Sequence, residues 1–305
     1  MNWKLTLSYD GSTFHGWQVQ PNLPTIQGTL SATLRHLTGE TVLPQGSGRT
    51  DAGVHALAQV TTFQLEAAIP AENLLRALNR ALPPSIRILS AEPVPETFHA
   101  RHSALAKTYE YRIFLRRHAT NRVPHVPSTW GHGLPQPSPE TAPDRICPPF
   151  LAPYVWDCHW PLSLTPMQEA AAHLLGTHDF TSFAAADPDR TQRNSLPSEP
   201  WGLNPKPTSA PNPTKTITQS TFTLEDDLFI YRITGSGFLH HMVRNIVGTL
   251  TEIGRGALTP EDIPRILAAR NRTAAGPTAP ASGLFLHTVH YESLLPIPYS
   301  LLPAL

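Results

Sequence analysis

GSGRTDAGVHA, residues 46–56, is the stretch that decides how the rest of the sequence is read. It surrounds one arginine and one aspartate with glycine, between two segments that read as strands, 40–45 and 57–65. A plain hairpin needs only a short glycine-containing turn, and this connection is longer. Glycine permits positive φ angles and a close approach of the backbone to a ligand. The stretch therefore predicts a loop that holds Asp51 in a fixed, partly buried position beside Arg49.

Asp51 can be structural or chemical. The structural alternative is an Asx turn, in which the carboxylate accepts hydrogen bonds from nearby backbone N–H groups. As a chemical group it can act as nucleophile, general base or metal ligand. No second acid follows it, and Arg49 would keep it ionised, which favours a nucleophile. Arg244, after GSGFLHH, is a second candidate partner, with a surface arginine as the alternative. A nucleotide-binding loop is disfavoured, because no Lys-Ser/Thr pair follows GSG.

The charge balance argues against a uniformly basic nucleic-acid coat. The chain has 305 residues, a formal net charge of zero and a pI of about 7.3. One local stretch is basic, and its only acid is Glu110; its basic residues are Arg101, Lys107, Arg112, Arg116, Arg117 and Arg122. This stretch predicts a groove that follows phosphates, or else a solvated strand face. Tyr109 and Tyr111 in the same stretch are suited to stacking on bases, or are ordinary sheet residues.

Other features narrow the class of protein. Cys147 and Cys158 are the only cysteines, too few for a disulfide framework or a four-cysteine zinc site. The first residues do not resemble a signal peptide, and no apolar run of about 18 residues could span a membrane. We expect a soluble, cytoplasmic protein. No HExxH spacing occurs, and the adjacent His240 and His241 would point about 100° apart on a helix. We therefore expect no metal.

Hydrophobic periodicity predicts strands alternating with helices in both halves. Strands are expected at 3–9, 85–91, 108–115, 216–224, 228–234 and 284–291. Helices are expected from 26 to 37 with caps at Thr25 and Gly39, and from about 70 to 82. Further helices are expected from a Thr165-Pro166 start to 175, from 238 to 253, and from a Thr259-Pro260 start to 270.

These elements predict an α+β protein with two similar halves, 1–116 and 161–305. The halves would form a mainly antiparallel central sheet with helices on one face, which leaves the other face for a large ligand. Residues 117–160 are rich in proline and read as a connector or insertion without packed elements. Residues 187–213 read as a second proline-rich insertion.

The loop GSGRTDAGVHA closely resembles the active-site motif of the TruA-type tRNA pseudouridine synthases. YDGSTFHGWQ, FHARHSALAKTYEYRI, LLGTHDFTSF and GFLHHMVRNIVGTL resemble further blocks of that family, in the same order. The blocks extend from about residue 5 to about residue 290. The resemblance implies the pseudouridine synthase fold and an isomerase that acts on uridines 38, 39 and 40 of the tRNA anticodon stem-loop, without cofactor or metal.

The resemblance also implies roles for single residues. Asp51 takes the nucleophile position, and Arg49 helps to displace the target base from its stack. Tyr109 lies against the uracil, with a second role as proton acceptor from C5 left open, and Arg244 pairs with the aspartate. Leu286 is implied in an apolar wall.

Flipping the base out of the stack costs a few kcal/mol. A homodimer is implied, with tRNA in a basic cleft lined by Arg101 and its neighbours. The alternative is a tRNA-binding or tRNA-folding module without turnover.

Overall fold

The computed structural model describes residues 1–116, 145–186, 212–225 and 227–292, which form two compact units. The first unit contains residues 1–110, 234–236 and the chain from 284 onward, and the second contains residues 111–233 and 237–283. The units are thus not contiguous in sequence. The boundaries suggested by the sequence, at 116/117 and 160/161, stay a prediction, because most of the proposed connector lies outside the described residues.

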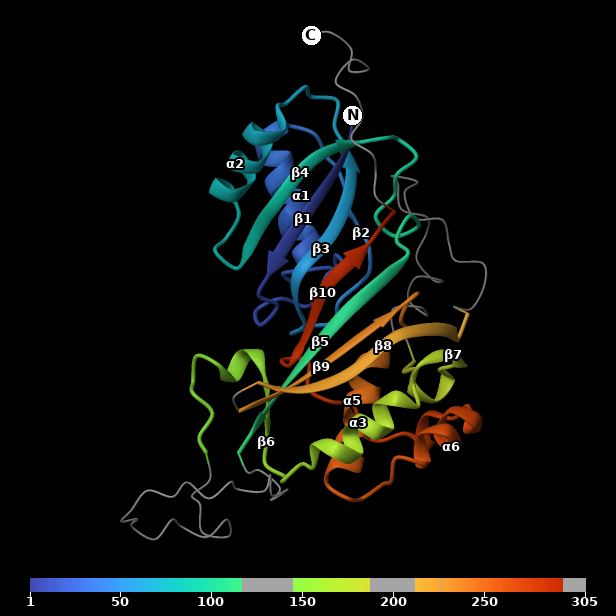
Figure 1. Cartoon of the computed structure of the whole chain (residues 1–305). Coiled ribbons are helices and arrows are strands. Elements are labelled where there is room, and N and C mark those ends of the chain that lie inside the picture. The colour runs from blue at the N-terminus through green and yellow to red at the C-terminus, as the bar shows by residue number, and fades with distance from the viewer. Residues whose placement is uncertain (117–144, 187–211, 226, 293–305) are drawn as a thin grey trace, which may run out of the picture. The chain divides into compact units, whose positions relative to one another are not determined.

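The first unit is a sheet with two helices. Its elements are β1 (Asn2–Tyr9), α1 (Ile26–Thr38), β2 (Gln45–Gly46), β3 (His55–Gln64), α2 (Ala71–Ala81), β4 (Ile86–Val94) and β10 (Leu284–His290). The strand order is β4-β1-β3-β10, in which β1 is antiparallel to both neighbours and β10 is parallel to β3. α1 contacts α2, and α2 contacts β4, so both helices lie on one side of these strands (Figure 1).

Local sequence explains β1 and α1. In β1 the alternate residues Trp3, Leu5 and Leu7 are buried, as the period-two pattern predicts. Helix α1 begins after Thr25, whose hydroxyl accepts a hydrogen bond from the N–H of Gly28 at 3.2 Å. It ends at Gly39, which has a φ of 77°. Both predicted caps are confirmed.

The second unit has the same kind of architecture. Strand β5 (Ala106–Leu115) starts in the first unit and enters the second at residue 111. The other elements are β6 (Trp156–Cys158), α3 (Leu164–Ala172), β7 (Gly176–Asp179), β8 (Thr214–Glu225), β9 (Leu228–Gly235), α5 (Met242–Gly254) and α6 (Asp262–Ala269), with short 3₁₀ turns η1 (Ala152–Tyr154), η2 (Thr181–Phe183) and η3 (Arg272–Ala274). The strand order is β5-β9-β8-β7, with β7 antiparallel to β8 and β6 parallel to β5. The α+β class with a mainly antiparallel sheet is confirmed.

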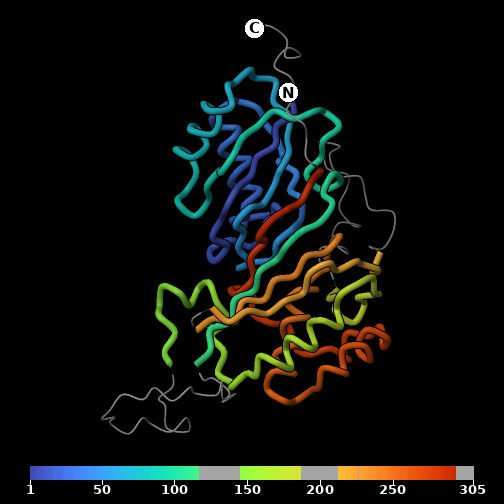
Figure 2. Tube along the Cα trace, viewed as in Figure 1, coloured from blue at the N-terminus to red at the C-terminus, as the bar shows by residue number. Residues whose placement is uncertain are grey.

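The C-terminal strand returns to the start of the chain. Figure 2 shows β10, in red, beside the blue strands of the first unit. The parallel ladder pairs Phe285 with His55 and Leu286 with Ala56. Strand β10 therefore pairs with the last two residues of the GSGRTDAGVHA stretch, where β3 begins.

Residues 40–45 were predicted as a strand, and this prediction is wrong for most of the segment. Only Gln45 and Gly46 pair with β3. The start of the segment is held by a side chain instead, because the Glu40 carboxylate accepts hydrogen bonds from the N–H groups of Glu66 and Ala67, both at 2.9 Å. A side-chain contact of this kind leaves no period in the sequence.

Two helix starts also differ from the prediction. Helix α3 starts at Leu164, not after Thr165, because Ser163, in an extended conformation, is its N-cap residue and Thr165 already lies inside the helix. Helix α5 starts at Met242, four residues later than expected, because His241 has a left-handed φ of 57°. The His240 and His241 rings are stacked with centroids 3.9 Å apart, whereas adjacent side chains on a helix would point about 100° apart.

The described end of the proline-rich connector is packed, contrary to the prediction. Strand β6 pairs with residues Ile113–Leu115 of β5. Val155 and Cys158 in this segment are buried. Cys147 and Cys158 are both free thiols, and burial raises the pKa of each. These contacts were not predicted, because the prolines interrupt the alternation of apolar and polar residues by which a strand is recognised in a sequence.

Within the described ranges, none of the helices combines the length and the hydropathy that crossing a membrane would require.

Candidate active site

The turn that carries Asp51 is held by backbone hydrogen bonds to a second loop, residues 10–17. The N–H of Trp17 donates to the carbonyl of Thr50 at 3.0 Å, and the N–H of Gly53 donates to the carbonyl of Phe14 at 3.4 Å. Within the turn, the N–H of Val54 donates to the carbonyl of Asp51 at 3.1 Å. The backbone on both sides of the acid is therefore fixed.

Glycines make this contact possible. Gly16 has a φ of 82°, and a Cβ atom there would lie 2.5 Å from the carbonyl oxygen of Thr50 and 3.1 Å from the carbonyl carbon of Asp51. A Cβ atom on Gly11 would lie 2.0 Å from the carbonyl oxygen of Val54. The glycines of YDGSTFHGWQ thus let one loop pack directly on the backbone of the other. Two blocks distant in sequence form one structure around Asp51.

Side chains fix the first part of the GSGRTDAGVHA loop. The Ser47 hydroxyl donates to Oε1 of Gln59 at 2.7 Å, and Nε2 of Gln59 donates to the carbonyl of Gly48 at 2.9 Å. Gln59 is completely buried. The Lys107 ammonium donates to the carbonyl of Ser47 at 2.6 Å and lies against Gly48. The segment before Arg49 is therefore held by side chains from two strands, β3 and β5.

Tyr9, on β1, supports the same turn through its hydroxyl group. Its hydroxyl is hydrogen-bonded to Oγ1 of Thr50 at 2.8 Å. Burial raises the pKa of Tyr9 to about 12, against a smaller opposing effect of that hydrogen bond. The phenol is therefore neutral at physiological pH. Its ring also lies 6.3 Å from the ring of Trp17, between centroids.

Tyr109 and Asp51 lie close enough to interact electrostatically. Tyr109 is buried, and burial is the main cause that raises its pKa well above the usual range. The ionisation of Tyr9 and the negative charge of Asp51 raise it further. Asp51 itself is half-buried, and Arg49 is exposed. Of the sequence-predicted site residues, Asp51 and Tyr109 are thus brought together within the first unit, and Arg49 precedes Asp51 by two residues on the same loop.

His55, at the end of the motif, was not singled out from the sequence. Its side chain is buried, and its Nδ1 accepts a hydrogen bond from the N–H of Gly11 at 3.1 Å. Nδ1 also lies 3.2 Å from a carboxylate oxygen of Asp10. The imidazole stacks on Phe285 with centroids 4.7 Å apart. The only sequence signal for this role was its place inside the motif.

Leu286, the next residue along β10, is fully buried opposite Ala56. Leu286 is therefore next in sequence to Phe285, whose ring stacks on His55. His55 is itself four residues after Asp51.

Arg244 belongs to the second unit, on α5 as expected. Nε of Arg244 donates to the carbonyl of Ala279 at 2.8 Å, and the N–H of Ala279 donates to the carbonyl of Arg244 at 3.1 Å. Its guanidinium also lowers the pKa of Tyr111, although burial has the larger effect and raises that pKa. Arg244 is therefore a half-buried, positioned arginine and not a freely moving surface side chain, which was the alternative from sequence.

The described basic residues of the stretch 101–122 differ in exposure and in their partners, so they do not form one continuous positively charged surface. Arg101 is exposed, and Lys107 is engaged with the loop as described. Arg116 forms an ion pair with Asp157 at 2.5 Å, which lowers the pKa of that carboxylate. The charge of Arg116 is therefore balanced by an acid from outside the stretch. Arg117 and Arg122 lie outside the described residues.

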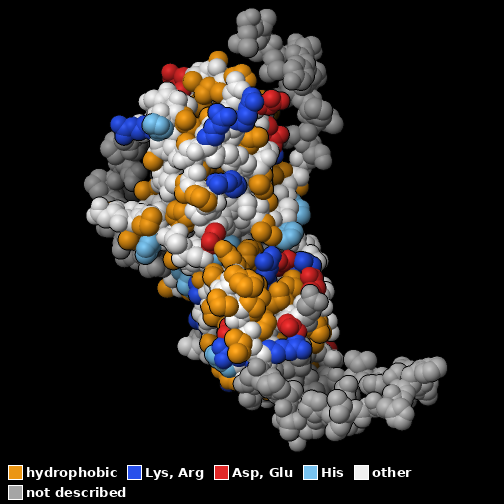
Figure 3. Space-filling model, turned by 90° about the vertical axis from the view of Figure 1, so that its left-hand side faces the viewer, with side chains coloured by type: hydrophobic (Ala, Val, Ile, Leu, Met, Phe, Trp, Pro, Cys, Tyr) orange, Lys and Arg blue, Asp and Glu red, His pale blue; other side chains and the backbone are white. Residues whose placement is uncertain are grey.

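The visible surface agrees with the balanced charge. Figure 3 shows basic side chains interspersed with other types over the first unit, and apolar side chains gathered on the face of the second. Among the described residues of the second unit, the most exposed large apolar side chains are Ile146 and Phe150, with 87% and 82% of their surfaces accessible. On the visible face, neither unit therefore carries a uniformly basic surface.

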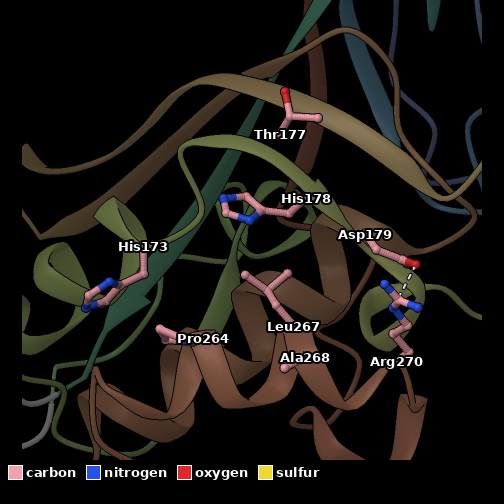
Figure 4. A pocket seen from close by; sticks show the side chains of 8 residues that line it. All are labelled: His173, Thr177, His178, Asp179, Pro264, Leu267, Ala268 and Arg270. Carbon is pink, nitrogen blue, oxygen red and sulfur yellow. Dashed lines mark ion pairs between the residues drawn. The ribbon is translucent and has the colours of Figure 1, made fainter.

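A separate hollow lies in the second unit. It has a volume of about 680 Å³ and lies between the end of α3, β7 and α6 (Figure 4). Its lining includes His173 and His178 over an apolar floor that contains Leu267. At one side Arg270 forms an ion pair with Asp179, with Nε 3.2 Å from the carboxylate. No sequence-predicted site residue lines this hollow.

Comparison with known proteins agrees with the motif. A family model described as "tRNA pseudouridine synthase" matches residues 6–103 and 202–292. The chain is 44% identical to tRNA pseudouridine synthase A of Solibacter usitatus (strain Ellin6076) over 94% of this chain and 98% of the relative. It is 42% identical to the protein of that name from Moorella thermoacetica, over 94% and 98%. It is 37% identical to that from Bacillus subtilis (strain 168), over 96% and 100%.

Proposed function

Because the chain belongs to the tRNA pseudouridine synthase family, we propose that it isomerises uridine to pseudouridine at positions 38, 39 and 40 of the tRNA anticodon stem-loop. The reaction breaks the bond between N1 of uracil and C1′ of ribose. The uracil then turns and is rejoined through C5, which loses its proton, while N1 gains one. A homodimer and a cytoplasmic location, where tRNA is available, complete the proposal.

The observation that carries the proposal is the fixed acid. Asp51 sits on a turn whose backbone is bound on both sides, and its charge acts on the buried ring of Tyr109. A pre-positioned carboxylate loses little freedom on reaching the transition state, which favours covalent or general-base chemistry on a bound nucleoside. Three first steps fit this geometry: attack on C1′, addition to C6, and removal of a ribose proton.

Arg49 and Tyr109 have complementary roles in the proposal. The exposed Arg49 is two residues from Asp51, so its guanidinium can occupy the place of the displaced base or bind its phosphate. Tyr109 offers a buried aromatic surface to the uracil. Its raised pKa favours contact with the base over proton acceptance, because the phenol already carries its proton at neutral pH. Arg101 would contribute to RNA binding, and Leu286 to the apolar wall.

The partnership of Arg244 with Asp51 stays a prediction drawn from the family motif. What supports a functional Arg244 is its half-buried position and its fixed backbone contact with Ala279.

The decisive experiment measures tritium release from tRNA labelled at C5 of uridine. We expect release by the wild type and a loss of at least about 10³-fold in Asp51→Asn, with tRNA affinity within about threefold. Transcripts with uridine at only one of the three positions would show which of them react. Binding without any release by the wild type would instead favour a tRNA-binding module. Light scattering at several concentrations tests the homodimer.

A further inference from the structure

Lys215 is a positive charge that the described structure partly buries and leaves without a counter-charge. It lies on β8, in the second unit, and is half-buried. Among the residues that the structure describes, no carboxylate pairs with its ammonium group and no acceptor hydrogen-bonds to it. Burial is the sole cause that lowers its pKa. Burying a charge without a partner is unfavourable, so the position calls for a function.

The side chain is held against a backbone segment that leads to a proposed site residue. It crosses Gly237, where a Cβ atom would lie 3.8 Å from Cδ and Cε and 3.9 Å from Nζ. These are ordinary contact distances, so the lysine stem packs on the glycine without strain. Gly237 opens the segment that continues into α5, the helix of Arg244. The ammonium is therefore fixed beside the GFLHHMVRN block, within the same unit.

The residues of β7 that lie beside Lys215 do not supply a negative charge for its ammonium group. Its partner in the ladder with β7 is His178, so the imidazole leaves the sheet on the same face. The ring nitrogen Nε2 of His178 is within 2.7 Å of the carbonyl of Leu175 and so donates to it. The next residue, Asp179, accepts from Thr181 and pairs with Arg270. The acid nearest in the ladder is thus already engaged.

We infer that Lys215 binds a backbone phosphate of the RNA substrate. This inference rests on the proposed function, which makes the ligand a polyanion. A phosphate would supply the counter-charge that the described chain lacks, and lysine binds phosphate as a point charge without a fixed geometry. Lys215 is a binding residue in this account and takes no part in bond making or breaking. It adds a contact outside the basic stretch 101–122.

The test compares Lys215→Met, Lys215→Arg and a matched control, Arg265→Met. Arg265 lies on α6 and is 62% exposed, and its carboxylate partner is Asp262 at 2.8 Å, so its loss changes the net charge equally. Binding of an isolated anticodon stem-loop RNA is measured over a series of KCl concentrations, together with the melting temperature of each protein. The slope of log K against log salt counts the phosphates that the protein neutralises.

We expect Lys215→Met to weaken binding about three- to tenfold at low salt and to reduce the slope by about 0.7–0.9. Its melting temperature should be unchanged or higher, since an unpaired buried charge is removed. Lys215→Arg and Arg265→Met should keep the wild-type slope. A wild-type slope in Lys215→Met, with or without a lower melting temperature, would overturn the inference, as would a reduced slope in Lys215→Arg. Failure of the proposed function appears separately, as absence of tritium release by the wild type.

Discussion

The protonation state of Tyr109 decides which role this residue can take. Burial, and then the nearby ionisable groups Tyr9 and Asp51, raise the pKa of its phenol, so the hydroxyl keeps its proton throughout the physiological range. A phenol in that state can present its ring to a uracil and donate a hydrogen bond. To accept the C5 proton it would first have to lose its own, at a cost that grows with the shift in its pKa.

We therefore predict that Tyr109→Phe keeps much of the activity, with a fall in kcat of about tenfold or less. Tyr109→Ala should lose at least about 100-fold, because the ring surface is removed and a cavity remains. The measurement is single-turnover tritium release between about pH 6 and pH 9. The pH profile of Tyr109→Phe should follow that of the wild type.

Tyr231→Phe is the control for that prediction, since it also removes a buried hydroxyl, bonded to Ser220 at 2.8 Å, but on β9 of the second unit, and it leaves Tyr109 and the turn of Asp51 intact. A loss of 10³-fold or more in Tyr109→Phe alone, with a changed alkaline limb, would assign proton acceptance to the phenol.

At the scale of elements, the turn of Asp51 depends on the loop 10–17 through glycine. Gly16 combines a positive φ with a contact that leaves no room for a side chain. Gly39, which ends α1, has a similar φ of 77°, but a Cβ atom there would meet nothing within 4 Å. The two glycines therefore separate the cost of backbone conformation from the cost of lost contact between the loops.

We predict that Gly39→Ala lowers the free energy of unfolding by about 1 kcal/mol and leaves turnover unchanged. Gly16→Ala should lower it by about 2–4 kcal/mol, because the added carbon must push the loop away from Thr50 and Asp51. Turnover should fall as well, measured at a temperature where the variant is folded. Equal effects of the two substitutions on stability and on turnover would mean that the loop contact does not position Asp51.

Elements with local signals were predictable from the sequence, and elements defined by distant contacts were not. The ends of α1 follow from Thr25 and Gly39, which act through their own neighbours. The start of α5 depends on the left-handed conformation of His241, and Glu40 is held by N–H groups far along the chain. The motif pointed to Asp51 and Arg49. Gln59 and His55 support that loop from β3. Gln59 reads as an ordinary strand residue, and His55 has no signal beyond its place in the motif.

At the scale of the whole molecule, the charge is balanced at neutral pH and rises as the pH falls. The chain has a formal net charge of zero with its 15 histidines neutral. The reference pKa of an imidazole is about 6.5 and that of a carboxylate about 4, so mild acid adds positive charge to histidines without protonating the carboxylates of ion pairs. The pKa of His99 is lowered, first by burial and then by His102 and Arg101, so this histidine gains its charge at a lower pH than a free imidazole does. The added charge is spread over the chain and is not confined to the proposed RNA contacts.

We predict that lowering the pH from about 7.5 to about 6 at fixed ionic strength tightens binding of both tRNA and an unrelated RNA hairpin. The hairpin should gain more, because spread charge attracts any polyanion, whereas the contacts that select the anticodon stem-loop do not multiply. The ratio of the two dissociation constants, measured by fluorescence anisotropy, should therefore shrink. Circular dichroism at both pH values controls for unfolding. An unchanged affinity for the hairpin would mean that the histidine charges do not reach bound RNA, and that recognition depends only on fixed cations such as Arg49 and Lys215.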